Sequence, residues 1–417
     1  MSGPTALDDI QTDPPAAPKG AVFTIFLIVA IDLLGVGLII PLLPFYAKHY
    51  DASPLQVELL FSVYSLCQFI AAPILGLISD RFGRRPVLIL SQIGSVLGYI
   101  LLGWATDYPW ANPMLGLTMI YISRVIDGLS GGNISTAQAY IADVTTSENR
   151  ARSMGLLGAA FGLGFAFGPA IGGALGHFDP SWPAYTAAAF SAVAAILTFV
   201  KLKESRIHRP AEAEAWLHPG NFVPILKKPV LLQLLLIWFV SMAAYMMMDA
   251  SAAMFLNDVF GFKELQVGLY FMFIGIIIAI VQGGVIRKLD RKYSEWSLAA
   301  IGVLCVSIGA FSTLTTAWKP LLWLLGLGGI VHAGGRSLQQ PTISSLVSKH
   351  AGKDEQGATM GLFQGLGSLA RTIGPVIGGI AYQGASKVEP TRPYITASVL
   401  LLGTTIWTWG VKRMARE

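Results

Sequence analysis

The sequence has little charge for its length. Charged residues make up 13% of the 417 residues, whereas hydrophobic residues make up 53% and the mean hydropathy is +0.59. A soluble globular domain carries about 25% charged residues, so this chain lacks the polar side chains that would cover a water-exposed surface. The composition excludes an ordinary soluble domain and indicates a polytopic membrane protein.

Cysteines and the motifs of energy-converting or catalytic sites are also scarce. The two cysteines, Cys67 and Cys305, lie in apolar segments, so we expect neither a disulfide nor a metal site. The sequence contains no G-x-x-x-x-G-K-[ST] phosphate-binding loop, no H-E-x-x-H and no Cys-x-x-Cys. We therefore expect a protein that is not an enzyme, needs no cofactor and draws on an ion gradient.

What the sequence does have is apolar segments of membrane-spanning length. A spanning helix needs about 20 mostly apolar residues, and this rule predicts helices over 21–46, 55–79, 86–105, 114–142, 151–176, 182–202, 229–256, 265–287, 295–316, 320–348, 356–384 and 393–412. We therefore expect an all-α integral membrane protein with twelve transmembrane helices. Its predicted parts are a disordered tail (1–20), a six-helix bundle (21–203), a polar linker (204–228), a second six-helix bundle (229–412) and a short tail (413–417).

The positions of the basic residues predict the orientation in the membrane. Of the 29 Lys and Arg residues, 21 lie in the termini, the linker and the loops on the same side, and five lie in the loops opposite. Cytoplasmic loops are enriched in Lys and Arg, so both termini are expected in the cytoplasm. Because the charges gather in loops, we expect the lipid bilayer, and no nucleic acid, as the surrounding partner.

The two predicted bundles share sequence. Residues 154–173, "MGLLGAAFGLGFAFGPAIGG", match residues 360–379, "MGLFQGLGSLARTIGPVIGG", at nine of twenty positions, with an offset of 206 residues. Parallel repeats of this kind occur in secondary transporters, whose substrate site lies between the halves near the middle of the membrane. The sequence therefore predicts an internal duplication.

A basic loop motif joins the second and third predicted helices. In "GLISDRFGRRP" (76–86), Gly76 and Gly83 suit a tight reversal, Arg81, Arg84 and Arg85 suit a cytoplasmic rim, and Asp80 suits the cap of a neighbouring helix. Any basic loop between membrane helices would carry some of these residues. The complete spacing G-x-x-x-D-R-x-G-R-R is far more specific.

This loop motif resembles the signature of the major facilitator superfamily. "GFAFGPAIGGALG" (164–176) resembles the antiporter motif of its drug:proton branch, and "IDLLGVGLIIPLLP" and "AYIADVTTSENRAR" are similar to the tetracycline exporter subgroup. The resemblance implies transport by alternating access. It also implies a latch between Asp80, Arg81 or Arg84 and Asp143. The latch would hold the halves together on the cytoplasmic side when the pocket faces outward, with Asp80 near the start of the helix at 356–384.

The antiporter-type motif has a physical reading of its own. Glycines recur every four residues from Gly164 to Gly176, and such ladders let helices approach closely. By resemblance, this helix packs on the helix at 265–287 of the other half. The equivalent helix at 356–384 repeats the glycines and the proline of the motif. The motif residues are Gly164, Gly168, Pro169, Gly172, Gly173, Gly374 and Pro375.

Charged residues inside predicted helices are candidates for function, because such residues are costly in a membrane. Arg124 and Asp127 are three residues apart and share a helix face. The family implies a role in proton coupling for Arg124, whereas the tetracycline exporters have no carboxylate at Asp127. Asp127 is therefore either a second proton site or a neutralising partner.

The remaining polar side chains are candidates for the substrate pocket. The resemblance implies that the helices at 21–46, 114–142, 229–256 and 320–348 line the cavity, which points to Asp249, His332 and Arg336. The full set of pocket candidates is Gln68, Gln138, Tyr245, Asp249, His332, Arg336, Gln339 and Gln364.

Asp32 lies in the first apolar run and matches the first-helix acid of the tetracycline exporters. A carboxyl group in a low-dielectric cavity binds protons more readily, so Asp32 is expected to couple proton movement to transport. The alternative is a salt bridge to Arg124 that only fixes two helices.

The sequence thus predicts a monomeric transporter of the cytoplasmic (inner) membrane. We expect it to export drug-like or amphipathic small molecules in exchange for protons. The same fold would also suit a symporter or facilitator for a sugar, an organic anion or a lipid. A transport-dead sensor is disfavoured because the sequence shows no signalling domain.

Overall fold

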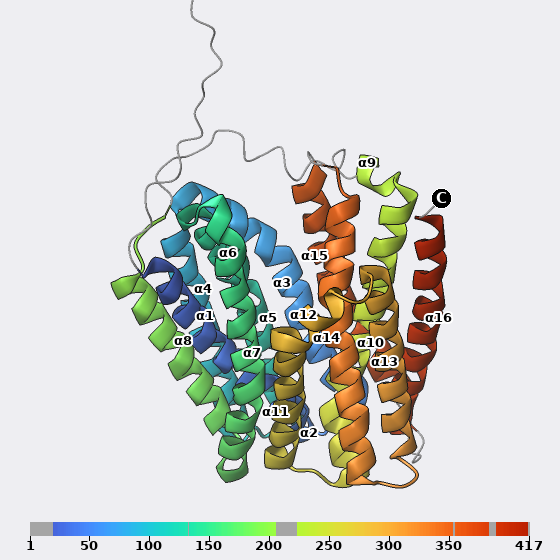
Figure 1. Ribbon diagram of the computed structural model, residues 1–417. Coiled ribbons are helices and arrows are strands. Elements are labelled where there is room, and N and C mark those ends of the chain that lie inside the picture. The colour runs from blue at the N-terminus through green and yellow to red at the C-terminus, as the bar shows by residue number, and fades with distance from the viewer. Residues whose placement is uncertain (1–19, 132, 206–222, 353–354, 383–388, 416–417) are drawn as a thin grey trace, which may run out of the picture.

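The structure is a computed structural model, and it describes residues 20–131, 133–205, 223–352, 355–382 and 389–415. Within these ranges the chain forms helices and connecting turns. Residues 1–19 of the predicted tail (1–20) and 206–222 of the predicted linker (204–228) lie outside the described residues. Figure 1 shows the helices running side by side, with the first half of the chain on one side of the molecule and the second half on the other.

The first half holds these elements: α1 (Ala21–Ile39), the 3₁₀ turn η1 (Ile40–Leu42), α2 (Leu43–Lys48), α3 (Pro54–Phe82), α4 (Arg84–Asp107), α5 (Pro113–Ser130), α6 (Asn133–Val144), α7 (Ser147–Phe178) and α8 (Trp182–Lys201). The second half holds α9 (Val223–Leu226), α10 (Pro229–Phe260), α11 (Glu264–Ile280), the π-helical η4 (Val281–Val285), α12 (Ile286–Asp290), α13 (Glu295–Thr315), α14 (Leu322–His350), α15 (Gln356–Tyr382), η6 (Glu389–Thr391) and α16 (Arg392–Met414).

Each predicted helix range falls on a helical segment, and three of them are interrupted. The range 265–287 is divided by the π-helical η4 between α11 and α12. The range 21–46 is divided by η1, where Pro41 and Pro44 remove backbone donors. The range 114–142 is divided between α5 and α6, where the backbone N–H of Gly131 bonds to the Gly128 carbonyl. These interruptions depend on local backbone geometry, which the apolar pattern does not contain.

Nine helices in the described part of the chain are long and apolar enough to cross a membrane. Large apolar side chains on their outer surfaces are exposed, among them Phe23 at 64%, Ile196 at 61% and Ile406 at 74%. Exposed apolar faces of this extent fit contact with lipid chains. The protein is therefore a multi-pass membrane protein, as its composition predicts.

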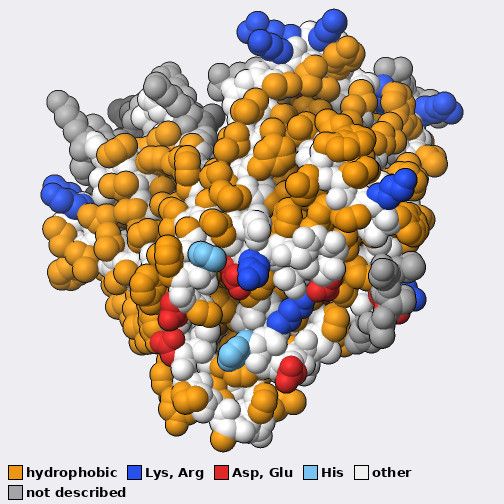
Figure 2. All heavy atoms as spheres, turned by 90° about the horizontal axis from the view of Figure 1, so that it is seen from below, with side chains coloured by type: hydrophobic (Ala, Val, Ile, Leu, Met, Phe, Trp, Pro, Cys, Tyr) orange, Lys and Arg blue, Asp and Glu red, His pale blue; other side chains and the backbone are white. Residues whose placement is uncertain are grey.

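The two halves meet on one side of the molecule, which we call the closed side. It holds α2, the first turns of α3 and α11, and the last turns of α10 and α15. There Lys48 of α2 contacts Asp258 at 2.6 Å and Asn257 at 2.9 Å, both on α10. Met254 and Tyr382 of the second half also belong to a buried apolar cluster made otherwise by the first half. Figure 2 shows the molecule from below, with acidic, basic and histidine side chains near the middle of a hydrophobic surface.

The opposite side carries α9 and the last turn of α16, and we call it the linker side (Figure 1). Helix α3 carries exposed apolar side chains in this half of its length, with Leu66 at 42%, Ile70 at 51% and Ile74 at 51%. Between described residues, the hydrogen bonds and ion pairs that join the halves lie toward the closed side: Lys48 with Asn257 and Asp258, and Ser251 with Glu58. The polar contacts that join the halves therefore lie on the closed side, and none of those named between described residues lies on the linker side.

Candidate substrate and proton sites

Asp32 lies in the middle of α1 and is 3% exposed. Asn133 of α6 donates its amide to one carboxylate oxygen, and the Ser191 hydroxyl of α8 donates to the other at 3.1 Å. Both partners are uncharged. Asp32 is thus held between three helices by neutral donors, which leaves its negative charge without a counter-charge among these contacts.

Arg124 and Asp127 form an ion pair on one face of α5, with Nη1 and Oδ2 3.3 Å apart. Each residue is 3% exposed, and the Arg124 guanidinium also lies over the Tyr99 ring at 5.6 Å. The second terminal nitrogen of Arg124, Nη2, is buried without a hydrogen-bond partner. The partner of Arg124 in this structure is therefore Asp127, and Asp32 bonds to Asn133 and Ser191.

A second charged pair joins α10 and α14 in the other half. Arg336 of α14 forms an ion pair with Asp249 of α10, and its guanidinium lies over the Tyr245 ring at 5.6 Å. The Tyr245 hydroxyl donates to Gln339 at 2.7 Å. Four of the predicted pocket residues thus form one polar cluster inside the second bundle.

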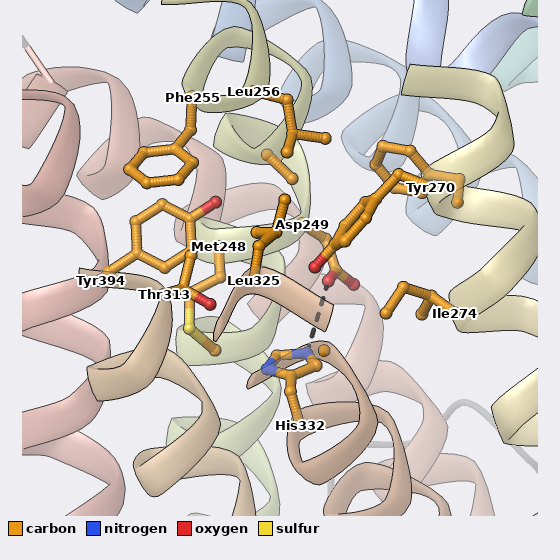
Figure 3. A pocket seen from close by; sticks show the side chains of 13 residues that line it. Met248, Asp249, Phe255, Leu256, Tyr270, Ile274, Thr313, Leu325, His332 and Tyr394 are labelled. Atoms are coloured by element: carbon orange, nitrogen blue, oxygen red, sulfur yellow. Dashed lines mark ion pairs between the residues drawn. The ribbon is translucent and has the colours of Figure 1, made fainter. Parts of the chain in front are cut away.

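His332 lies beside this cluster. Its Nε2 is 3.9 Å from an oxygen of Asp249, a separation too long for a hydrogen bond. Figure 3 shows His332 and Asp249 facing one another across a small cavity, with the Tyr270 side chain directed toward Asp249. The cavity has about 50 Å³ of free space. A few water molecules fit such a volume, whereas drug-sized ligands occupy pockets of about 300–1,000 Å³.

The predicted glutamines occupy three different environments. Gln68 donates to the Gly131 carbonyl at 3.1 Å, at the break between α5 and α6. Gln339 is fully buried, and its Nε2 has no hydrogen-bond partner. Gln138 and Gln364 are exposed. The structure therefore brings Gln339 into the cluster around Tyr245 and places Gln68, Gln138 and Gln364 elsewhere.

The basic loop motif folds into a network centred on Arg84, which is 6% exposed. Arg84 contacts Asp80 at 2.7 Å, Asp143 at 3.1 Å and the Ser79 hydroxyl at 2.5 Å. All three partners belong to the first half. The network therefore joins α3, α4 and α6, and its members come together as the motif predicts. In this structure, these contacts of Arg84 do not cross to the second half.

One prediction about this loop was wrong. Gly76 lies inside α3, which continues to Phe82, and the chain reverses at Gly83, whose φ is +104°. The start of α4 is capped by a residue that the sequence did not point to: the carboxylate of Glu204 accepts the backbone N–H groups of Arg84 at 2.8 Å and Arg85 at 3.1 Å. Because Gly83 has no side chain to cap α4, a carboxylate from the end of α8 takes that role.

The glycine ladder of α7 packs mainly on α1 of its own half. A Cβ atom placed on Gly164 would lie 2.7 Å from the Leu33 carbonyl oxygen, and one on Gly168 would lie 2.7 Å from the Gly37 Cα. Gly172 meets the backbone of Leu38. These three glycines therefore face α1 of their own half, and other residues of α7 make the predicted contact with the helix at 265–287.

A neighbouring face of α7 does meet the other half. Pro169 and Gly173 of α7 pack on the backbone of Gly268 in α11, so that neither side has room for a larger residue. Helix α7 therefore has one glycine face for α1 and a second, offset by one residue, for α11.

The repeat in α15 reproduces this arrangement 206 residues later. Gly374 packs on Ala243 of α10, as Gly168 packs on Gly37 of α1, while Gly379 packs on Leu55 and Glu58 of α3. Pro375 lies inside α15 as Pro169 lies inside α7. The internal duplication predicted from the sequence is thus visible as equivalent packing.

Comparison with known proteins identifies the fold family. The family model described as Major Facilitator Superfamily matches residues 25–375. The chain belongs to the Major Facilitator Superfamily.

The curated relatives of the chain include tetracycline resistance proteins. It is 29% identical to the class C tetracycline resistance protein of Escherichia coli over 393 residues, which cover 92% of this chain and 95% of that protein. It is 31% identical to the class B protein of the same organism, with 85% and 86% covered. The crystal structure of the human organic anion transporter MFSD10 (TETRAN) has a TM-score of 0.69 and 24% identity, covering 94% of this chain and 99% of that one.

These likenesses agree with the resemblance drawn from the sequence motifs. The protein is a membrane transporter of the Major Facilitator Superfamily. Sequence reasoning did not find Asn133, Ser191 or Glu204, because each acts on a partner more than 100 residues away. A polar residue in an otherwise apolar helix is the only signal that would have pointed to Ser191 on α8.

Proposed function

We propose that this transporter exports drug-like or amphipathic small molecules in exchange for protons, by alternating access. The observation that carries the proposal is the environment of Asp32: a buried carboxylate with two neutral hydrogen-bond partners, Asn133 and Ser191. Burying an ion without a counter-charge is costly. A proton is the simplest species that neutralises such a group, and its release returns the charge.

In the proposed cycle, rocking of the halves makes Asp32 accessible first from one side of the membrane and then from the other. Asp32 binds its proton on one side and releases it on the other, and it is covered in the conformation described here. Arg124 and Asp127 lie in the same half and set the local potential, so we assign them to coupling as well. The tetracycline resistance proteins among the relatives support drug export as the transported class.

The proposed substrate site lies between the halves, because the cavity beside His332 is too small for a drug-sized molecule. Tyr245, Asp249, Arg336 and Gln339 form its wall in the second half. Gln68, Gln138 and Gln364 would contact substrate on the linker side, where α3 and α15 are exposed.

The arrangement in the membrane follows from the basic residues. We propose twelve crossings with both termini in the cytoplasm, which makes the linker side cytoplasmic and this conformation open to the cytoplasm. A bacterial inner membrane is the proposed location, as the relatives from Escherichia coli suggest. We propose that a monomer is sufficient, and that the proton gradient takes the place of a cofactor.

A second candidate is transport of an organic anion by symport or facilitated diffusion. Arg371 of α15 favours it, because this cationic side chain donates to the Ser368 hydroxyl at 2.6 Å and forms no ion pair among the described residues. The likeness to a human organic anion transporter supports the same alternative at the level of fold.

Proteoliposomes with a trapped pH-sensitive dye and an imposed pH gradient test the proposal. Cationic, neutral and anionic compounds are added to the wild-type protein, to Asp32→Asn and to Ser191→Ala. Proton movement that a compound triggers in the wild type, that Asp32→Asn lacks and that Ser191→Ala retains in part supports antiport and identifies the substrate class. Equal substrate movement without protons in the wild type and Asp32→Asn contradicts it.

A further inference from the structure

Glu58 is a second fully buried carboxyl group, and the proposed coupling through Asp32 does not use it. It lies near the start of α3 on the closed side and is 0% exposed. Its Oε1 is 2.6 Å from the Ser251 hydroxyl of α10, and its Oε2 is buried without a hydrogen-bond partner. The Glu58–Ser251 contact therefore joins the two halves of the protein.

The hydrogen-bond geometry around Ser251 suits a protonated Glu58. The Ser251 oxygen is 2.6 Å from Glu58 Oε1 and 2.8 Å from the Met247 carbonyl oxygen, and it can donate to either, but a hydroxyl group has only one hydrogen. A proton on Glu58 Oε1 satisfies both contacts at once, because Ser251 then accepts from Glu58 and donates to Met247.

The groups around Glu58 provide no counter-charge for its ionised form. Among the residues that the structure describes, Glu58 takes part in no ion pair. The titratable side chains on neighbouring elements have partners of their own: Lys48 of α2 pairs with Asp258, Tyr382 of α15 donates to Asp258, Tyr121 of α5 donates to Gln56, Arg124 pairs with Asp127, Asp249 pairs with Arg336, Arg371 donates to Ser368, and Tyr394 of α16 packs on Phe255. An ionised Glu58 would be an isolated buried charge.

Separation of the halves would change this environment directly. A Cβ atom on Gly379 of α15 would lie 2.9 Å from the Glu58 Cβ, so the second half covers the side chain closely. Glu58 belongs to the first half, whereas Ser251 and Gly379 belong to the second. When the closed side opens, Glu58 loses its hydrogen-bond partner and its cover in the same movement, and water reaches it.

We infer that Glu58 is a proton-binding residue of the closed side, which holds a proton while the halves are joined there and releases it to water when that side opens. The step is a single ionisation: the O–H bond on Oε1 breaks, the proton passes to water and the carboxylate stays on Glu58. This inference rests on the alternating access of the proposed function. It adds a second proton site to Asp32, near the start of α3 on the closed side.

The sign of the pH effect follows from this assignment. The joined state binds the proton and the open state does not, so low pH favours the joined state and high pH favours opening. The variant Glu58→Gln keeps the shape and a donor for Ser251 but has nothing to release. It is expected to remain joined on the closed side at every pH.

The test measures the distance between spin labels across the closed side without any substrate. Labels are attached to His49→Cys and Lys263→Cys, both exposed positions in opposite halves, after Cys67→Ser and Cys305→Ser. In the otherwise unchanged protein, raising the pH is expected to lengthen the distance. Glu58→Gln is expected to lose most of this lengthening, whereas Glu264→Gln, a partly exposed glutamate on the same side, keeps it.

A second variant, Ser251→Ala, keeps the test valid if Glu58→Gln does not fold. Ser251→Ala removes the acceptor of the protonated carboxyl, which weakens the joined state and shifts the midpoint of opening to lower pH. The inference is overturned if Glu58→Gln opens with the unchanged midpoint and amplitude, if the parent protein shows no pH dependence, or if Ser251→Ala leaves the midpoint unmoved. Because the measurement uses no substrate, failure of drug:proton exchange in proteoliposomes would leave its result standing.

Discussion

Gly168 of α7 and Gly374 of α15 lie 206 residues apart and pack in the same way, each on the first helix of its own half. A Cβ on Gly168 would meet Gly37 of α1, and one on Gly374 would meet the Ala243 carbonyl of α10. The two positions are thus equivalent in sequence and in structure. Both contact backbone atoms, which cannot move aside as a flexible side chain would.

The variants Gly168→Ala and Gly374→Ala are therefore expected to destabilise the protein. Overpacking a close helix contact costs about 1–3 kcal/mol, and the melting temperature in detergent should fall in both. Gly155→Ala and Gly361→Ala are matched controls, since a Cβ at either position meets nothing within 4 Å. Alanine favours a helix over glycine by up to about 1 kcal/mol, so the controls should melt at the same temperature or slightly higher. Equal losses in all four variants would contradict the packing argument.

The Arg124–Asp127 pair allows its structural and coupling roles to be separated. Arg124→Gln or Asp127→Asn alone leaves one buried charge unpaired, which costs about 3–5 kcal/mol, and the melting temperature should fall in each. The double variant removes both charges and should recover most of that loss.

Transport assays on these three variants then decide the role of the pair. If Arg124 and Asp127 couple proton movement, the double variant is stable and still fails to exchange substrate for protons. If the pair only neutralises itself, the double variant transports at close to the wild-type rate. Thermal unfolding and dye-loaded proteoliposomes provide the two readouts.

The Lys48–Asp258 ion pair is expected to bias the conformation with little effect on stability. Both side chains are about one-third exposed, at 35% and 34%, and such pairs contribute about 0.2–1 kcal/mol. Lys48→Ala should therefore raise the fraction of molecules open on the closed side by up to about fivefold. Fluorescence energy transfer between labels across that side would report the change.

Lys349→Ala is the matched control for this measurement. Lys349 pairs with Glu295 at 2.9 Å, but both residues belong to the second half. Its removal should leave the distance across the closed side unchanged. High salt should reduce the difference between Lys48→Ala and wild type, because exposed ion pairs are screened. A salt-independent difference would count against an electrostatic cause.

Glu204 is expected to hold the start of α4. Glu204→Ala removes the acceptor of the Arg84 and Arg85 N–H groups, and loss of a helix cap costs about 0.5–2 kcal/mol. Hydrogen exchange of the first α4 amides should accelerate, and the melting temperature should fall. Lys203→Ala changes the neighbouring exposed residue and should have neither effect. Unchanged exchange in Glu204→Ala would show that another group caps the helix.

The sequence predicted what depends on local pattern. Apolar runs of membrane length located the helices, the 206-residue repeat predicted the equivalent packing of α7 and α15, and the three-residue spacing predicted that Arg124 and Asp127 share a face. The pairing of Asp249 with Arg336 could not be derived in this way, since their relative position depends on how α10 and α14 pack. The wrong reading of Gly76 has the same origin: a helix continues through glycine when tertiary contacts supply the stability that glycine lacks.

The charged side chains inside some of the helices have a consequence for how the protein is inserted into the membrane. Helices α5, α14 and α15 are absent from the nine described helices that are apolar enough to span on their own. They carry Arg124 with Asp127, His332 with Arg336, and Arg371 respectively. In the twelve-crossing arrangement proposed above, charged side chains at a helix centre oppose insertion by about 2.5–3.5 kcal/mol each. We therefore expect these three helices to enter the bilayer together with an already inserted neighbour, and the apolar α13, which packs on α14, is such a neighbour. Assembly of each bundle is then expected to begin before its last helix has been made.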